Sequence, residues 1–200
     1  MALILASASP RRQDLLRSAG IPFSVQPTDI PEIPQAGEPP QKCAERLARE
    51  KALAVFRLRP ADYVLGADTI VVLDNLILGK PGDAADAARM LRLLSGHTHQ
   101  VITGVCLAGP EKPVGSSPSP VASGTFSDTR SEITQVTMEA LAEDEIQRYV
   151  ATGEPMDKAG AYAIQGIASR WISRIEGDYA NVVGLPVALV YGMLLEHGAL

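Results

Sequence analysis

The stretch from Tyr63 to Leu73 is the feature of this sequence that most constrains how the chain folds. It is continuous, apolar and rich in β-branched residues, which is typical of a strand buried on both faces of a sheet. Asp68 lies in its middle, and Gly66 and Ala67 leave the approach to that carboxylate open. A buried carboxylate needs a cation, a metal or a proton. Since a structural ion pair has no obvious partner nearby in the sequence, Asp68 is predicted to be a functional group.

The N-terminal run combines a short strand with a helix whose first turn carries an unfavourable charge. Leu3 to Ala6 is apolar, and Ser9 and Pro10 are typical of a helix N-cap and first helical position. Arg11 and Arg12 follow directly, where the helix dipole disfavours cations. A phosphate held by backbone N–H groups, serine hydroxyls and the two guanidinium groups would remove this conflict. The alternative is a pair of solvated arginines beside surface acids.

A helix is predicted from Gln41 to Arg57, and a cation lies on its apolar face. At 100° per residue, Lys51 falls in the middle of a stripe made by Ala44, Leu47, Ala48 and Val55. Its ammonium group must either extend to the edge of the stripe or meet an anion inside the protein. The preceding Pro-rich, acidic stretch 26–40 is predicted to be a loop. Within it, Glu32 is either a solvated acid, which the sequence favours, or part of a cleft.

The remaining segments predict short strands and helices joined by turns. Asp74-Asn75 turns the buried strand back into 76–78, so that Lys80 follows at the end of the hairpin. Asp83 is predicted to cap a helix over 84–95. Further strands are predicted at 21–25, 97–108, 131–138 and 171–175, and further helices at 142–152 and 187–195. The stretch 109–127, rich in Pro, Ser and Gly, is predicted to be a mobile surface insertion.

Two further segments carry candidate ligand-binding groups. Asp157, Lys158 and Gln165 lie among small residues and glycines, which suits a backbone that closely approaches a ligand, although the segment can equally be a plain connection. His97 and His99 alternate on a predicted strand. Two histidines without nearby partners are a weak indication of a zinc site.

Composition excludes several classes of protein. The chain of 200 residues has 18 Lys and Arg against 23 Asp and Glu, so it lacks the basic excess of a nucleic-acid-binding protein. Cys43 and Cys106 are too few for a disulfide framework, the start has no basic signal-peptide region, and no apolar stretch approaches the roughly 18–20 residues that span a bilayer. Neither a Walker A sequence nor a dinucleotide glycine fingerprint is present. We therefore expect a cytoplasmic protein of one structural unit that acts on a small molecule, without a nucleic-acid or membrane partner.

The candidate groups form one chemical set. Four cations can neutralise a polyphosphate, while two carboxylates can hold a divalent, oxygen-preferring ion such as Mg²⁺ or Mn²⁺, or activate water. The members of this set are Arg11, Arg12, Lys51, Lys80, Glu32 and Asp68. The set suits attack at phosphorus, because the cations spread the developing charge.

Six motifs occur in order along nearly the whole chain: Ser7-Ala8-Ser9-Pro10-Arg11-Arg12, Arg49-Glu50-Lys51-Ala52, Gly66-Ala67-Asp68-Thr69, Gly79-Lys80-Pro81, Asp157-Lys158-Ala159-Gly160-Ala161-Tyr162 and Gln165-Gly166. Together they resemble the Maf family of nucleoside triphosphate pyrophosphatases. The resemblance implies a single domain over 1–200 with an α/β fold. An elongated mixed β-sheet with flanking helices would form two lobes around a central cleft, akin to the inosine triphosphate pyrophosphatases. The implied reaction splits a nucleoside triphosphate into the monophosphate and pyrophosphate with a divalent metal.

The same resemblance implies roles for particular residues. Asp68 would be the general base or a metal ligand, and Glu32 a second metal ligand. Phosphate and sugar contacts would come from Ser7, Ser9, Arg11, Arg12, Lys51 and Lys80. The motifs are similar to the branch that prefers dTTP and UTP, in which Arg11, Thr69 and Gln165 would set the choice of base. Modified pyrimidine triphosphates are further expected substrates.

Two other functions stay open at this point. One is an inosine or xanthosine triphosphate pyrophosphatase of the related fold, and the other is a non-catalytic nucleotide-sensing module that acts in cell division. The stretch 109–127 is longer than is usual for the Maf family, where it can alter dimer contacts or an edge of the cleft. A homodimer is the expected assembly.

Overall fold

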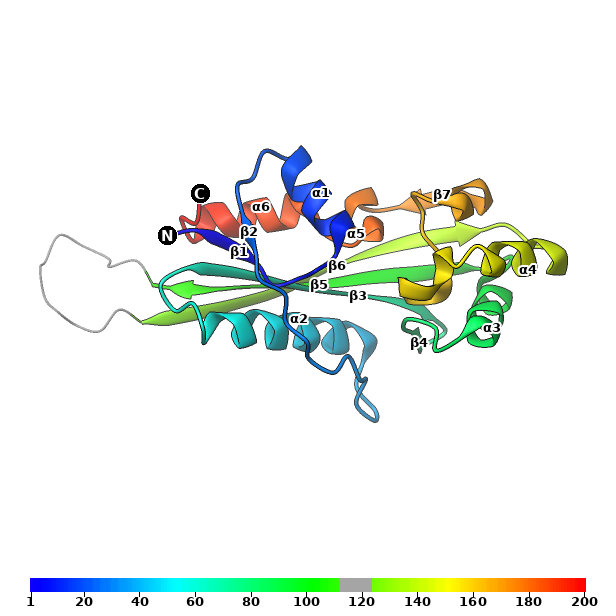
Figure 1. Ribbon diagram of the computed structural model, residues 1–200, viewed down its shortest axis with the longest axis horizontal. Helices are drawn as coiled ribbons and strands as arrows, with labels where there is room; N and C mark the ends of the chain where they lie inside the picture. Colours follow the sequence, from blue (N-terminus) through cyan, green and yellow to red (C-terminus); the bar gives the residue numbers. More distant parts are fainter. Residues whose placement is uncertain (112–123) are drawn as a thin grey trace, which may run out of the picture.

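The computed structural model describes residues 1–111 and 124–200, which form a seven-stranded mixed sheet with helices on both faces (Figure 1). The strands are β1 (Leu3–Leu5), β2 (Ser24–Val25), β3 (Tyr63–Leu73), β4 (Leu76–Leu78), β5 (Thr98–Pro110), β6 (Thr125–Met138) and β7 (Ile172–Glu176). The helices are α1 (Pro10–Ser18), α2 (Pro40–Phe56), α3 (Ala84–Leu94), α4 (Glu143–Ala151), α5 (Tyr179–Val183) and α6 (Val187–Glu196). Short 3-10 helices lie at Glu154–Asp157, Ala159–Ala161 and Ile167–Trp171. The predicted mixed α/β fold with flanking helices is confirmed.

The sheet is organised around β3, the strand that the apolar pattern predicts most clearly. Its order is β2-β1-β3-β5-β6-β7, and β4 also pairs with β3. β1 runs parallel to β2 and β3, whereas β3, β4, β5, β6 and β7 pair antiparallel. β3 is buried along nearly its whole length. The Asp74-Asn75 turn joins β3 to β4 with positive φ at both residues, as a tight hairpin requires.

The long hairpin of β5 and β6 corrects the predicted bounds of the surface insertion. Residues 109–110 and 125–127, which were predicted to lie within it, are paired as strand residues. The ring of Tyr63 packs so closely on Gly109 that a Cβ there would lie 2.4 Å from Tyr63 Cδ1, and Phe126 stacks on His197 with ring centroids 3.9 Å apart. These partners are distant in sequence, so a local pattern could not reveal them. The backbone N–H of Glu111 donates to the Gly124 carbonyl at 2.7 Å, and residues 112–123 of the predicted insertion lie outside the described residues.

Helices cover the two faces of the sheet unequally. α2 lies along one face, and α1, α5 and α6 lie on the other (Figure 1). Two glycines let the backbone of α2 approach the sheet directly. A Cβ on Gly66 of β3 would lie 2.2 Å from the Ala48 carbonyl oxygen, and a Cβ on Gly104 of β5 would lie 2.3 Å from that of Ala44. This close packing fixes the face of α2 that carries Lys51 against β3.

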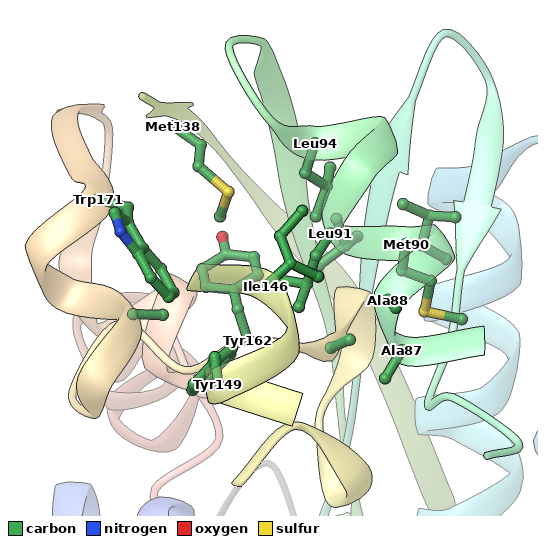
Figure 2. Packing of buried hydrophobic residues seen from close by; sticks show 14 of the residues in the cluster. Ala87, Ala88, Met90, Leu91, Leu94, Met138, Ile146, Tyr149, Tyr162 and Trp171 are labelled. Carbon is green, nitrogen blue, oxygen red and sulfur yellow. The ribbon is translucent and has the colours of Figure 1, made fainter. Parts of the chain in front are cut away.

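A separate apolar core fills one end of the molecule. α3 and α4 pack there against the 3-10 segments and the sheet, with Leu91, Ile146, Tyr149 and Trp171 among the buried side chains (Figure 2). The rings of Tyr149 and Trp171 meet edge to face with centroids 5.3 Å apart. This core holds the segment after α4 in place.

Most predicted elements are present, with small shifts of their ends. The strand expected at 21–25 is only two residues long, and a short helix that the sequence did not predict, α5, precedes Gly184. Ser9 stands at the N-cap of α1, but its side chain makes no capping hydrogen bond. Within the described residues, no helix is both long and apolar enough to cross a bilayer.

Candidate functional site

The site lies where one edge of β3 is left without a neighbouring strand. On that edge, β1 pairs with Tyr63–Leu65 and β4 pairs with Val71–Leu73, so in the described part of the chain residues 66–70 have a strand partner only on the β5 side. A cavity of about 960 Å³ opens at this gap and is lined by the segment after β1, by α1, α2, β3 and β4, and by the turn after α5. A volume of this size is within the range of small-molecule binding sites.

The alternation of side chains along β3 sends two neighbouring residues to different partners. Asp68 contacts Lys51 of α2, whereas Thr69 contacts Arg12 of α1 and the Gly184 carbonyl after α5. Successive strand residues point to opposite faces of a sheet. Because the edge of β3 is open here, both side chains still reach the same cavity.

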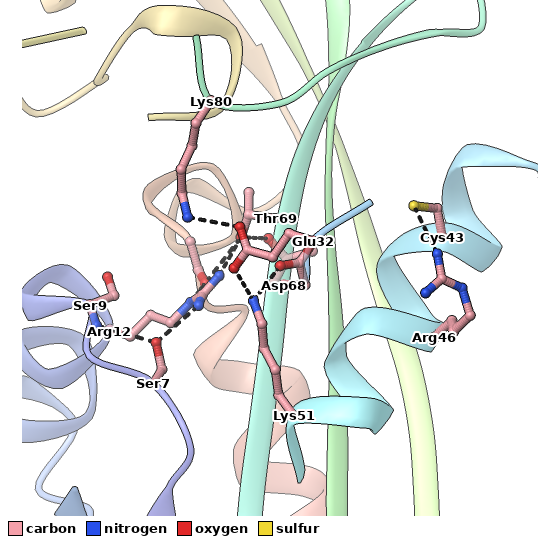
Figure 3. Close-up of polar contacts among 12 residues, drawn as sticks. Ser7, Ser9, Arg12, Glu32, Cys43, Arg46, Lys51, Asp68, Thr69 and Lys80 are labelled. Atoms are coloured by element: carbon pink, nitrogen blue, oxygen red, sulfur yellow. Dashed lines mark hydrogen bonds and ion pairs between the residues drawn. The ribbon is translucent and has the colours of Figure 1, made fainter. Parts of the chain in front are cut away.

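Two carboxylates and two lysines form the charged half of the site (Figure 3). Lys51 Nζ lies 2.6 Å from Asp68 Oδ1 and 2.6 Å from Glu32 Oε1, while Lys80 Nζ lies 2.8 Å from Glu32 Oε2. Lys51 and Asp68 are only 6% and 5% exposed. Of the two alternatives for Lys51, the structure therefore places its ammonium group inside, on anions. Both charges of the buried pair are compensated, as burial demands.

Glu32 is not the solvated loop acid that the sequence favoured. Its side chain reaches back from the loop before α2 and bridges Lys51 and Lys80. Burial alone would raise the pKa of Glu32, but the hydrogen bonds and charges of the two lysines outweigh it and lower the pKa to about 2. Glu32 is therefore an anion at any pH near neutrality.

A second group of contacts surrounds Arg12. Its Nε donates to the Gly184 carbonyl at 2.8 Å, Nη1 to Ser7 Oγ at 3.1 Å and Nη2 to Thr69 Oγ1 at 3.0 Å. Burial lowers the pKa of the guanidinium from its ordinary value, and the charges of Asp68 and Glu32 oppose that shift. Arg12 is thus a partly buried cation that links α1, β3 and the turn after α5, and it is not a solvated side chain.

The Gly-rich segment after α4 forms the facing wall of the cavity. Arg11 Nη1 lies 3.5 Å from Asp157 Oδ2, and Lys158 Nζ donates to Asp157 Oδ1 at 2.5 Å and to the Glu154 carbonyl at 2.6 Å. Gln165 is exposed and lines the cavity. Asp157 and Lys158 were noted in the sequence but given no role, and the structure adds them to the site.

All ten predicted site residues line this one cavity: Ser7, Ser9, Arg11, Arg12, Glu32, Lys51, Asp68, Thr69, Lys80 and Gln165. Direct contacts divide seven of them into the lysine–carboxylate cluster and the group around Arg12. Sequence reasoning missed the Gly184 carbonyl, because a backbone acceptor leaves no side-chain pattern to find.

The donor set suits a divalent cation only together with a ligand. Within 1–111 and 124–200, no three His, Cys, Asp or Glu side chains gather into a group that could hold a metal ion. Mg²⁺ and Mn²⁺ are commonly bound by one or two carboxylates while phosphates and water supply the other oxygens. Glu32 and Asp68, which meet on one ammonium group, fit that pattern.

The two histidines do not share a ligand position. His99 Nε2 lies 2.8 Å from the Tyr162 hydroxyl, and burial lowers the pKa of this ring to about 4, so it is neutral. His97 is exposed and its Nδ1 lies 2.8 Å from the Ser95 carbonyl. Their separate partners do not favour a zinc site between them.

The chain is similar to known proteins along nearly its whole length. A family model described as "Maf-like protein" matches residues 2–197. The chain is 55% identical to a dTTP/UTP pyrophosphatase of Koribacter versatilis, over 100% of this chain and 96% of the relative. It is 50% identical to proteins of the same description from Syntrophomonas wolfei (97% and 96% covered) and Geobacter sulfurreducens (99% and 97% covered). Among solved structures, a nucleoside-triphosphatase / dITP/XTP pyrophosphatase from Mycobacterium abscessus matches 70% of this chain and 76% of its own, at 14% identity and a TM-score of 0.40.

Proposed function

This chain belongs to the Maf family, and from that premise we propose that it is a hydrolase that converts dTTP and UTP to the monophosphate and pyrophosphate. In this reaction the oxygen of a water molecule forms a bond to phosphorus, and the P–O bond between the α and β phosphates breaks. Pyrophosphate leaves with the electron pair of the broken bond. Modified pyrimidine triphosphates are further candidate substrates.

The observation that carries the proposal is the meeting of Glu32 and Asp68 on one buried ammonium group, within a cavity lined by further cations. A triphosphate brings several negative charges that need compensation. The carboxylates would repel such a ligand if no cation stood between them and it. Lys51 and Lys80 already hold positive charge at that place.

We assign the phosphate contacts to the charged half of the site and the base contacts to its other parts. The phosphate and sugar oxygens would be held by Lys51, Lys80, Arg11 and Arg12, with Ser7 and Ser9 before α1 as further donors. Thr69, Arg11 and Gln165 would set the choice of base. Asp68 would accept the proton of the attacking water or serve as a metal ligand.

A divalent cation, Mg²⁺ or Mn²⁺, is part of this proposal. Glu32 and Asp68 would hold it, and when bound it supplies charge that stabilises the phosphates during the reaction. Removal of divalent ions with a chelator should abolish turnover, and added Mg²⁺ should restore it. Turnover that persists undiminished in excess chelator would contradict a metal requirement.

The direct test is a panel of nucleoside triphosphates incubated with the protein and Mg²⁺, with products separated by ion-exchange chromatography. The expected products are dTMP or UMP and pyrophosphate. Asp68→Asn should abolish turnover while nucleotide binding and folding persist, because the change removes a charge but little volume. Asp74→Asn makes the same chemical change in the exposed turn that ends β3 and should leave activity unchanged.

Each other outcome of the nucleotide panel would indicate a different function or a different reaction. Preferred turnover of inosine or xanthosine triphosphate would indicate the purine-directed enzyme. Tight nucleotide binding without any product would indicate a nucleotide-sensing module. Release of orthophosphate and a diphosphate would refute the proposed position of bond cleavage.

Two expectations about the cellular form belong to the same proposal. The enzyme would act in the cytoplasm on the nucleotide pool, without a nucleic-acid or membrane partner. It would assemble as a homodimer, which light scattering coupled to size-exclusion chromatography would test.

A further inference from the structure

A hydrogen-bonded chain of two threonine hydroxyl groups runs from the cavity into the sheet. Thr103 of β5 lies directly opposite Thr69 in the antiparallel register, and their Oγ1 atoms are 2.9 Å apart. Thr103 is fully buried. Its Oγ1 also lies 3.1 Å from the backbone carbonyl of Asn181 in α5, and Arg12 Nη2 lies 3.0 Å from Thr69 Oγ1. The contacts thus connect a cation, two hydroxyls and a carbonyl in series.

The groups at the two ends of this hydrogen-bonded series determine which atom donates in each hydrogen bond. Arg12 can only donate hydrogen bonds, and a backbone carbonyl can only accept them. α5 has only five residues, so the carbonyl of Asn181 needs a hydrogen-bond donor from outside the helix. The hydroxyl of Thr103 is that donor. Thr103 then has no hydrogen left for Thr69 and must accept from it. The order is Arg12 to Thr69, Thr69 to Thr103, and Thr103 to the Asn181 carbonyl.

This order leaves Thr69 with only one way to meet a ligand. Its single hydrogen points inward, to Thr103 or to the Gly184 carbonyl 3.3 Å away, and one of its two acceptor positions is taken by Arg12. The remaining position is an acceptor. A phosphate oxygen needs a donor, so Thr69 does not suit phosphate and suits a group that carries N–H or O–H.

We propose that Thr103 is a positioning residue that fixes the Thr69 hydroxyl as an acceptor and thereby selects a uracil or thymine base over cytosine. The ring nitrogen N3 of uracil and thymine carries a hydrogen, whereas N3 of cytosine is a bare acceptor. An acceptor-only Thr69 pairs with the first and repels the second. This inference deepens the proposed function and rests on it.

The test compares UTP with CTP, which share the same ribose and triphosphate, so that their ratio reports only on the base. Thr103→Val keeps the shape of the side chain and removes its hydroxyl. Thr69 then loses its nearer inward acceptor and keeps only the Gly184 carbonyl at 3.3 Å, so its hydrogen can turn toward the cavity more readily and donate to cytosine. The ratio of kcat/KM for UTP over CTP should fall about two- to tenfold, which corresponds to one hydrogen bond. Thr103→Ser keeps the hydroxyl and should restore the ratio of the natural protein.

Thr134→Val is the matched control. Thr134 is also fully buried, and its hydroxyl bonds the Asp178 carbonyl and the Asn181 side chain, so it supports α5 without touching Thr69. This variant should lose a comparable amount of stability and keep the UTP-to-CTP ratio. A Thr103→Val protein that loses activity on both nucleotides in equal proportion would overturn the proposal, as would an equal change of ratio in Thr134→Val.

Binding separates this inference from the proposed function. Dissociation constants for UTP and CTP, measured by titration calorimetry on the same variants, give the base preference without catalysis. A natural protein that binds UTP but releases no pyrophosphate refutes the proposed function, and the affinity ratios then decide the role of Thr103. A natural protein that does not distinguish UTP from CTP in either assay overturns the role of Thr103.

Discussion

Lys51→Met should be far more destabilising than a lysine-to-methionine change normally is. The side chains of Lys51 and Asp68 are 8% and 7% exposed, and their charges meet at 2.6 Å. Methionine fills a similar volume but leaves the Asp68 carboxylate buried without its cation. Loss of one partner of a buried pair typically costs about 3–5 kcal/mol.

Lys80→Met is the matched comparison, because Lys80 also bonds Glu32 but its side chain is 56% exposed. An exposed ion pair contributes about 0–1 kcal/mol. We expect both variants to lose activity, since both lysines line the cavity, while only Lys51→Met loses substantial stability. The pair therefore separates the structural role of Lys51 from the function that it shares with Lys80.

Urea unfolding at pH 7, followed by the fluorescence of Trp171, measures these differences. Trp171 is the single tryptophan and is buried in the core near α4, so its emission reports on unfolding and lies outside the variant site. The double variant Lys51→Met with Asp68→Asn removes both charges and should recover more than half of the loss. The reasoning is refuted if Lys51→Met costs no more than Lys80→Met, or if the double variant is as unstable as the sum of its single changes.

Four further substitutions test the fold and the site. Gly66→Ala should destabilise the protein by about 1–3 kcal/mol and reduce activity, because the added Cβ would meet the backbone of α2. Gly192→Ala in α6 has open space around it and should stabilise the protein by up to about 1 kcal/mol. Thermal unfolding measures both changes in stability. Burial lowers the pKa of the His99 ring to about 4 in the folded protein, whereas a histidine in the unfolded chain takes up its proton near pH 6.5. Between pH 7 and pH 5 the proton therefore binds mainly the unfolded chain, and the free energy of unfolding should fall by about 2 kcal/mol. His99→Phe should flatten that slope, and an unchanged slope would assign the pH dependence elsewhere. Gly184→Ala should lower activity by disturbing the carbonyl that holds Arg12, because φ is +129° there, and unaltered kinetics would argue against that positioning.

Much of the fold could be predicted because its strongest elements have local causes. β3 follows from a continuous apolar, β-branched run, and α2 follows from its period, which also placed Lys51 on the buried face. The hairpin after β3 follows from Asp74-Asn75, whose side chains tolerate positive φ. The ends of the β5–β6 hairpin could not be predicted, since Gly109 and Phe126 find their partners in Tyr63 and His197.

The sequence by itself determined which groups need partners. A carboxylate within a buried strand and a lysine on an apolar stripe are each unfavourable alone, and this follows from burial, which local patterns reveal. It also determined that Arg11 and Arg12 stand at the positive end of a helix dipole.

Only the tertiary structure decided which partners those groups have. Asp68 and Glu32 meet on Lys51 because α2 packs closely on two glycines of the sheet, and Arg12 reaches a carbonyl 172 residues away. The open edge of β3 and the direction of the hydroxyl chain through Thr103 likewise depend on strand register and on the position of α5. A local pattern reports that a residue is buried, but the identity of its partner is set by contacts between distant segments, which exist only in the folded chain.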